Sequence, residues 1–420
     1  MTNLVETADV EPRSAPHAGM GFREFVGFVA ALMAINALAI DAMLPALPQI
    51  GDALGVVEEN QRQLVITSYL LGFGVAQLFY GPLSDRFGRR PVLLFGLVVY
   101  VLASGAAAMA SSLDGMILAR VVQGIGSAAT RVLAVSIVRD CYSGRHMARV
   151  MSFAFIVFIA VPVIAPSVGQ AIVLVAPWEW IFLVLGLFGL TVALWSLARL
   201  PETLPPERRT PISVASVLGA FRIVATNRAA LGYTLASAAI LGALFGFINS
   251  AQQIFVEVFG TGAAFPLIFA GIALFIAVSS LVNARIVERV GMRRVSHTAM
   301  FGFTGFAALH AAIAWSGHES LAVFVVLQAA MMFCFGLIMS NFSSMAMDPV
   351  GRVAGTAASF QGFVTTVIGA LLGFYIGQHY DGTAVPLTLG YAGLGALSIA
   401  IVLVTERGRL FEPVNAAPRP

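Results

Sequence analysis

The 420-residue chain contains no lysine, so arginine carries all of its permanent positive charge. Charged residues make up only 11% of the chain and hydrophobic residues 59%, whereas soluble domains carry roughly 25% charged residues. There are two cysteines, Cys141 and Cys334, and six scattered histidines. These scarcities argue against a soluble domain, a structural disulfide and a metal site. The chain also lacks a Walker phosphate-binding sequence, so ATP is not the expected energy source, and we expect neither an enzyme nor a cofactor.

Apolar runs long enough to cross about 30 Å of hydrocarbon recur along the whole chain. They predict an all-α membrane protein with twelve transmembrane helices. The expected spans are residues 22–45, 61–81, 91–110, 115–138, 147–173, 178–199, 229–251, 264–287, 295–315, 321–343, 352–378 and 385–405. The corresponding domains are a tail at 1–21, a six-helix bundle at 22–200, a linker at 201–228, a second six-helix bundle at 229–405 and a tail at 406–420.

The distribution of arginine predicts the orientation of these spans. Arginines gather in the tails and in the loops after even-numbered spans, while the opposite loops are acidic and hold only Arg62. By the positive-inside rule, both termini are expected in the cytoplasm of a multi-pass protein of the plasma membrane, here a bacterial inner membrane. The excess of basic residues therefore reflects the orientation of the chain in the membrane, and we expect no nucleic-acid partner.

Between two uncharged stretches the chain reads GPLSDRFGRRP, residues 81 to 91. We expect a tight turn between two helices here, with a close helix approach at Gly81, a positive φ at Gly88 and a helix start at Pro91. Asp85 is placed to reach a helix N-terminus or a neighbouring arginine. The residues singled out in this string are Gly81, Asp85, Arg86, Gly88, Arg89 and Arg90.

The same pattern recurs in the second half of the chain. A shift of 203 residues places Asp85 to Arg90 on Glu288 to Arg293, with acid, Arg, Gly and Arg at matching intervals. The repeat predicts two pseudo-symmetric six-helix bundles with a substrate site between them near the membrane midplane.

Three ionisable residues lie within spans and away from their ends: Asp41 in the first, and Arg120 and Arg131 in the fourth. Ionisable groups in hydrocarbon are costly and point to function. Gln123 and Ser127 share a helix face with both arginines, and this polar stripe either lines a cavity or packs on another polar helix. Asp41 and Arg120 fall at similar depth, so pairing is permitted. Burial disfavours the ionised form of the Asp41 carboxyl group, whereas a nearby arginine favours it. A carboxyl group with these two opposing influences is suited to take up and release a proton.

Further polar positions within spans are candidates for substrate contact, and each has an alternative as an interhelical hydrogen bond. They are Tyr69, Gln77, Asn249, Gln253, Asn341 and Gln361. His310 is expected to be a packed, neutral histidine. In the fifth span, Pro162 and Pro166 predict a kinked helix, which packs closely on its neighbours and includes Gly169.

The string at 81–91 resembles the loop signature of the major facilitator superfamily. That resemblance implies that Asp85, Arg86, Arg89 and Arg90 latch the two halves together on the cytoplasmic side. LARVVQGIGSAA at 118–129 is similar to the fourth-span signature of proton-coupled transporters, which implies a role for Arg120 in proton transfer. The segments that resemble the bicyclomycin-resistance/CflA group of drug–proton antiporters are IDAMLPALP (40–48), GVAQLFYGPLSDRFGRRPVLL (74–94), IVRDCYSG (137–144), WEWIF (178–182) and LPETL (200–204).

The fifth span departs from the antiporter signature, which ends Gly-Pro-x-x-Gly-Gly. This chain has Ala165 to Gln170 there and keeps only Pro166 and Gly169. The resemblance implies a proton-coupled antiporter that exports small, largely apolar drugs or metabolites by alternating access. A proton-coupled uptake symporter for a small metabolite is the alternative, followed by facilitated diffusion and by a sensor that moves nothing. Asp41 argues against unaided diffusion. The expected partners are a small molecule, protons and the bilayer, with the chain acting as a monomer.

Overall fold

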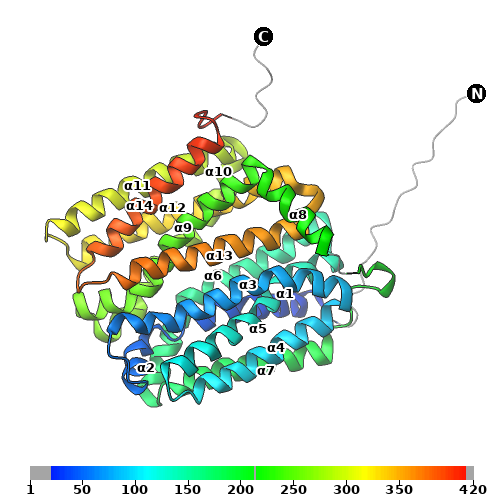
Figure 1. Cartoon of the computed structure of the whole chain (residues 1–420), viewed down its shortest axis with the longest axis horizontal. Coiled ribbons are helices and arrows are strands. Elements are labelled where there is room, and N and C mark those ends of the chain that lie inside the picture. Colours follow the sequence, from blue (N-terminus) through cyan, green and yellow to red (C-terminus); the bar gives the residue numbers. More distant parts are fainter. Residues whose placement is uncertain (1–19, 212–213, 413–420) are drawn as a thin grey trace, which may run out of the picture.

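The computed structural model describes residues 20–211 and 214–412, and within them the chain is helical, without β-strands (Figure 1). The prediction of an all-α protein is therefore confirmed. The helices of the first half are α1 (Phe22–Asp41), α2 (Leu47–Ala53), α3 (Leu64–Phe87), α4 (Arg89–Ala108), α5 (Leu113–Cys141), α6 (Gly144–Val175) and α7 (Glu179–Arg199). Those of the connection and second half are α8 (Val214–Thr226), α9 (Arg228–Gln252), α10 (Phe265–Val290), α11 (Met292–Trp315), α12 (Leu321–Met347), α13 (Ala354–Gln378) and α14 (Val385–Thr405).

Within the described ranges, eleven helical segments are long and apolar enough to cross a membrane. The expected fifth span coincides with α6, of which residues 160–175 count as a shorter apolar helix. All twelve expected spans thus fall on helices, and the chain is a multi-pass membrane protein.

The helices form two bundles that lie side by side (Figure 1), one built by α1 to α7 and the other by α9 to α14. The halves meet where α3 packs on α13 and α6 packs on α10. We call the end of the molecule where α1 begins and α14 ends the terminal face, and the opposite end, where α1 ends and α3 begins, the far face.

The string at 81–91 is more helical than we expected. Helix α3 continues through Gly81 and Pro82 to Phe87, and α4 begins at Arg89, so the turn consists of Gly88 alone. Gly88 has a φ of +99°, and Gly291, its equivalent in the repeat, has a φ of +90°. A side chain is strained at such angles, which explains glycine at both positions. The matching turns support the internal repeat.

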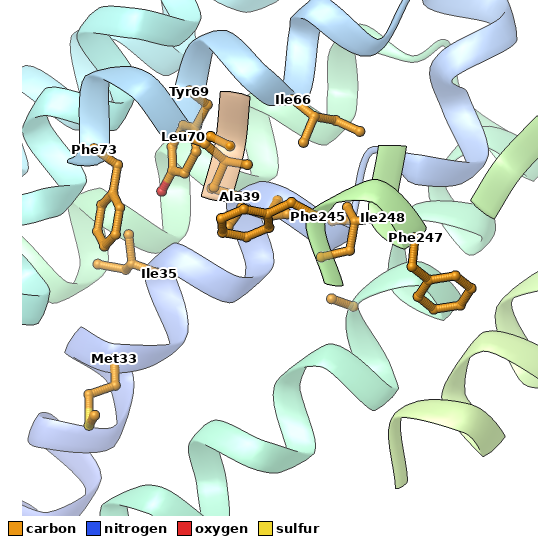
Figure 2. Close-up of a cluster of buried hydrophobic side chains, with 14 of the residues drawn as sticks. Met33, Ile35, Ala39, Ile66, Tyr69, Leu70, Phe73, Phe245, Phe247 and Ile248 are labelled. Carbon is orange, nitrogen blue, oxygen red and sulfur yellow. The ribbon is translucent and has the colours of Figure 1, made fainter. Parts of the chain in front are cut away.

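An apolar cluster joins the two halves toward the far face (Figure 2). Phe245 of α9 lies beside Ala39 of α1 and Leu70 of α3, and Ile248 of α9 is its neighbour in the cluster. These side chains are at most 8% exposed. They therefore form an apolar contact between α9 and the helices α1 and α3 at this level.

Candidate functional site

Arg120 of α5 is fully buried and holds three helices together. Its Nε donates to the carbonyl oxygen of Val65 in α3 (2.8 Å) and its Nη2 to that of Ala39 in α1 (3.0 Å). Its Nη1 donates to Oε1 of Gln123 (2.5 Å), and the guanidinium lies over the ring of Tyr69, 4.4 Å from the centroid. A buried guanidinium needs such partners to offset its lost hydration. The hydrogen bonds of Arg120 described here therefore go to α1, to α3 and to its own helix α5.

Asp41 is the last residue of α1 and is 4% exposed. Its Oδ1 has no hydrogen-bond partner among the described residues, and no ion pair joins it to Arg120. The pairing that their similar depth permits is thus not formed, although Arg120 bonds the carbonyl two residues before Asp41. A buried carboxylate without a cation is costly, so this environment suits the neutral, protonated carboxyl group.

Some residues of the polar stripe of α5 form hydrogen bonds with neighbouring helices, and another keeps an exposed side chain. The hydroxyl of Tyr69 donates to Oγ of Ser127 (2.7 Å), and Nε2 of Gln123 donates to Oγ of Ser104 in α4 (2.7 Å). Arg131, at the other end of the stripe, lies deep in the protein and yet keeps an exposed side chain. A residue that lines an open cavity has both properties.

At the terminal face, Arg89 stands at the centre of a polar cluster. Its side chain donates to Asp85 (2.6 Å), to Ser84 (2.6 Å) and to Asp140 at the end of α5 (2.9 Å). Glu202 accepts hydrogen bonds from the backbone N–H of Arg89 (2.8 Å) and so caps the start of α4, where a carboxylate is favoured by the helix dipole. The segments IVRDCYSG and LPETL supply Asp140 and Glu202 to this cluster.

Asp85 does not bond the second half of the chain among the described contacts. Its side chain is 46% exposed, and the side chain that it contacts, Arg89, belongs to the same half. A cavity of about 490 Å³ lies beside it, lined by residues of α8 and by the start of α13 at Val353 to Thr356. The described ion pairs at the terminal face likewise each stay within one half. Arg86 and Arg90 point elsewhere, Arg86 toward the ring of Phe87 and Arg90 to the carbonyl of Leu197.

At the far face, by contrast, hydrogen bonds tie the two halves together. We call these the far-face contact, formed by Asn60, Arg62, Gln63, Gln253, Glu257 and Gln378. Gln63 donates to Oε1 of Gln253 (2.7 Å), and Gln253 donates to Oδ1 of Asn60 (2.9 Å). Gln378 donates to the carbonyl oxygen of Asn60 (2.7 Å). The molecule is therefore closed at its far face.

Charged groups extend the far-face contact to the surface. Arg62 pairs with Glu59 (3.0 Å) and with Glu257 (3.5 Å), which lies in the π-helical turn Gln253–Val258 that ends α9. Tyr380 donates to Glu257 (3.5 Å), and burial, together with that carboxylate, raises the pKa of its phenol. A cavity of about 510 Å³ opens here between the two halves. π-turns often accompany functional positions, and this one aims its polar side chains across the interface.

The other candidates for substrate contact are spread over the interface and the second half. Gln77 donates to Thr366 of α13 (3.3 Å), and Asn249 accepts from Thr67 of α3 (3.5 Å), so both lie between the halves. Gln253 belongs to the far-face contact. Asn341 donates to Asn283 within the second half (2.7 Å), and Gln361 of α13 is half-buried.

The fifth-span residues bring α6 against the turn that follows Asp41. Gly169 lies so close to the backbone of Ala42 that a Cβ placed there would be 2.8 Å from its carbonyl carbon. Pro162 and Pro166 both lie inside α6. Small residues allow such close helix contact in membranes, and Gly169 thereby positions the end of α1.

Several residues of the site were not predicted from the sequence. Asn60, Gln63 and Gln378 lie at span ends, where polar residues are common, so nothing marked them as a contact between halves. Asp140 and Glu202 did carry a signal, because they belong to segments of the resemblance. In the part of the chain that the structure describes, no three His, Cys, Asp or Glu side chains gather as a metal site.

The chain matches the family model of the Major Facilitator Superfamily over residues 29–374. It is 29% identical over 391 residues to a Haemophilus influenzae protein named bicyclomycin resistance protein homolog, with 91% of this chain and 96% of that protein covered. It is 28% identical over 390 residues to the multidrug resistance protein MdtL of Vibrio parahaemolyticus, with 89% and 90% covered.

Two solved structures share the fold. One is the human organic anion transporter MFSD10, with a TM-score of 0.66, 21% identity and coverage of 91% of this chain and 100% of that chain. The other is a mutant of the nucleoside transporter NupG, with a TM-score of 0.67, 14% identity and coverage of 91% and 99%.

Proposed function

Because the chain belongs to the major facilitator superfamily, we propose that it is a proton-driven efflux transporter that exports small, largely apolar compounds in exchange for protons. The relatives named for bicyclomycin resistance and multidrug resistance support export of drugs. We propose that the chain acts as a monomer, with protons and a small molecule as its partners.

The observation that carries the proposal is the environment of Asp41. A buried carboxyl with an unpartnered oxygen, at the end of α1 and next to the Arg120 cluster, is suited to hold a proton when neutral. Loss of that proton creates a buried charge, which must be rehydrated or paired. Movement of α1 against α5 and α6 supplies that change, and Asp41 thereby links proton binding to the conformation of the transporter.

The walls between the halves support a preference for apolar compounds. Phe245, Ile248 and Leu70 lie in the cluster that joins the bundles (Figure 2), while Arg131 keeps an exposed side chain deep in the first half. Ligand sites are typically apolar with a few polar groups that fix orientation. We propose that substrate enters between the halves and is held by apolar contacts, with Arg131, Gln77 and Asn249 as polar contacts.

The arginine distribution supports a bacterial inner-membrane protein with both termini in the cytoplasm. On this orientation the terminal face is cytoplasmic, the far face is extracytoplasmic and the structure is closed toward the outside. In the opposite state, we propose that Asp85 crosses the neighbouring cavity to the N-terminus of α13, where a carboxylate is favoured. The Arg89 cluster positions Asp85 for this contact.

The proposal is tested with the purified chain in proteoliposomes. Fluorescent apolar cations, neutral compounds and anions are offered with and without an imposed pH gradient, and accumulation is followed for each. Efflux exchange predicts that a substrate moves uphill only when protons move downhill in the opposite direction. Substrate that accumulates on the side to which protons flow would instead identify a symporter, and transport that is independent of the gradient would refute proton coupling.

A further inference from the structure

The second half contains a buried polar cluster that the proposed mechanism does not use. Its members are His310 of α11, Glu319 of the following loop, Gln328 of α12 and Tyr391 of α14. His310, Gln328 and Tyr391 are each 0% exposed. Nε2 of His310 lies 2.5 Å from Oε1 of Glu319, whose side chain is 10% exposed and reaches the far face.

Three of these residues share one depth in the second bundle, and Glu319 lies above them in the loop. His310 lies five residues before the far-face end of α11 at Trp315, Gln328 seven residues after the start of α12 at Leu321, and Tyr391 six residues after the start of α14 at Val385. At 1.5 Å per residue these positions are all about 8–11 Å below the helix ends. Tyr391 also lies near Glu319, and it adjoins Gln328.

Four polar atoms of this cluster have no hydrogen-bond partner among the described residues: Nδ1 of His310, both amide atoms of Gln328 and the hydroxyl of Tyr391. Gln328 and Tyr391 are neighbours, but their contact lacks the geometry of a normal hydrogen bond. Buried polar groups are nearly always paired with protein or with water. Buried polar atoms of this kind are where internal water molecules bind in proteins.

The cluster is connected to the far-face contact through aromatic rings. The ring of His310 packs edge-on against Phe324, with centroids 5.0 Å apart. Phe324 in turn packs on Phe255 and on Phe259, each at 5.4 Å. Phe255 lies in the π-helical turn Gln253–Val258, which carries Gln253 and Glu257 across to the first half.

We propose that His310 and Glu319, with water held by Gln328 and Tyr391, form a second protonation site that stabilises the closed far face when protonated. Glu319 is partly exposed in the far-face loop and so gives a proton a route from that face to His310. Among the described contacts, Glu319 is the titratable group that meets His310, and α12 contributes the uncharged Phe324. Gln328 of α12 and Tyr391 of α14 lie at the same depth.

The direction of the effect follows from the structure. The His310–Glu319 contact is formed while the far face is closed, and protonation converts it into an ion pair with a charge-assisted hydrogen bond. A proton that is held more tightly in the closed state shifts the equilibrium toward closure. A charge-assisted hydrogen bond is stronger than a neutral one. The difference in their strength corresponds to a ratio of closed to open molecules that is about fivefold higher at pH 5 than at pH 8.

The test measures opening of the far face without substrate. Spin labels are attached at Val57→Cys in the first half and Ala263→Cys in the second, both exposed positions at the far face, in a chain with Cys141→Ser and Cys334→Ala. Distance distributions are recorded between pH 5 and pH 8 in nanodiscs. We expect the short-distance population to fall as the pH rises.

The variants His310→Gln and Glu319→Gln should each abolish this pH dependence, and the double variant should add nothing further. His318→Gln is the matched control, since His318 is exposed and its imidazole lies within hydrogen-bond distance of Ser316. Glu319→Gln changes a single atom at the edge of the cluster, so it tests the site even where His310→Gln impairs folding. The shift should also persist with Asp41→Asn, which separates this site from the proposed coupling site.

No pH-dependent shift in the parent chain would overturn the proposal. A shift that survives both His310→Gln and Glu319→Gln would overturn it as well, because other groups of the far face would then carry the titration. Loss of the shift in His318→Gln, equal to that in His310→Gln, would overturn it too, because the effect would then not be specific to the cluster.

Discussion

Substitution of Gly169 by alanine should both destabilise the protein and impair its coupling. The added Cβ would lie far inside van der Waals distance of the Ala42 carbonyl oxygen and 2.8 Å from its carbonyl carbon. Both neighbours are backbone, so helix α6 must move away from the end of α1. Overpacking of this kind costs about 1–3 kcal/mol.

The functional consequence follows from the position of Ala42, which comes directly after Asp41. Displacement of this turn changes the surroundings of the carboxyl group, so we expect Gly169→Ala to lower proton-driven transport several-fold at equal expression. The assays are thermal unfolding of the purified protein in detergent and pH-gradient-driven transport in proteoliposomes.

Gly271→Ala in α10 is the matched control, because nothing lies within 4 Å of a Cβ at that position. Alanine is favoured over glycine in a helix interior by roughly 0.5–1 kcal/mol, so the control should be as stable as the parent or more so. The reasoning is refuted if Gly169→Ala unfolds and transports like Gly271→Ala.

Three further predictions follow from the same contacts. Arg120→Ala should destabilise the protein by about 2–5 kcal/mol and abolish transport, because two carbonyls and an amide lose their donor; thermal unfolding near the parent value would contradict this. Asp85→Asn should reduce transport but largely preserve substrate binding, by weakening the outward-facing state by roughly 1–3 kcal/mol, and unchanged transport would refute the latch. Cysteines placed at Ser112 and Ser316 should react with an impermeant thiol reagent outside intact cells, while Cys141 should not; labelling of Cys141 from outside would overturn the orientation.

Much of the fold could be predicted because membrane insertion leaves strong signals in a sequence. Long uncharged runs mark the spans, and Gly88 and Gly291 mark two equivalent turns through their positive φ angles. The string around Asp85 likewise predicted a polar cluster at one face. It did not predict that α3 continues to Phe87, since Gly81 and Pro82 are typical helix breakers, although here both lie inside the helix and Gly81 lies close to Ser359 of α13.

The partners of the buried polar residues were harder to predict. Arg120 was predicted to be functional, but two of its three acceptors are backbone carbonyls, which every residue has. Only the packing of α1 and α3 determines which carbonyls face it. His310 and Glu319 lie nine residues apart on either side of a turn, and no periodic pattern indicates that they meet. Contacts of this kind depend on tertiary packing, which hydrophobic periodicity alone does not specify.

The central claim is that Asp41 carries the proton that drives export. Its most direct test is Asp41→Asn, measured side by side for substrate binding at several pH values and for accumulation driven by a pH gradient. We predict that the variant still binds substrate, with little dependence on pH, and that it fails to accumulate substrate against its gradient. Uphill, proton-dependent export by Asp41→Asn at normal expression would contradict the assignment.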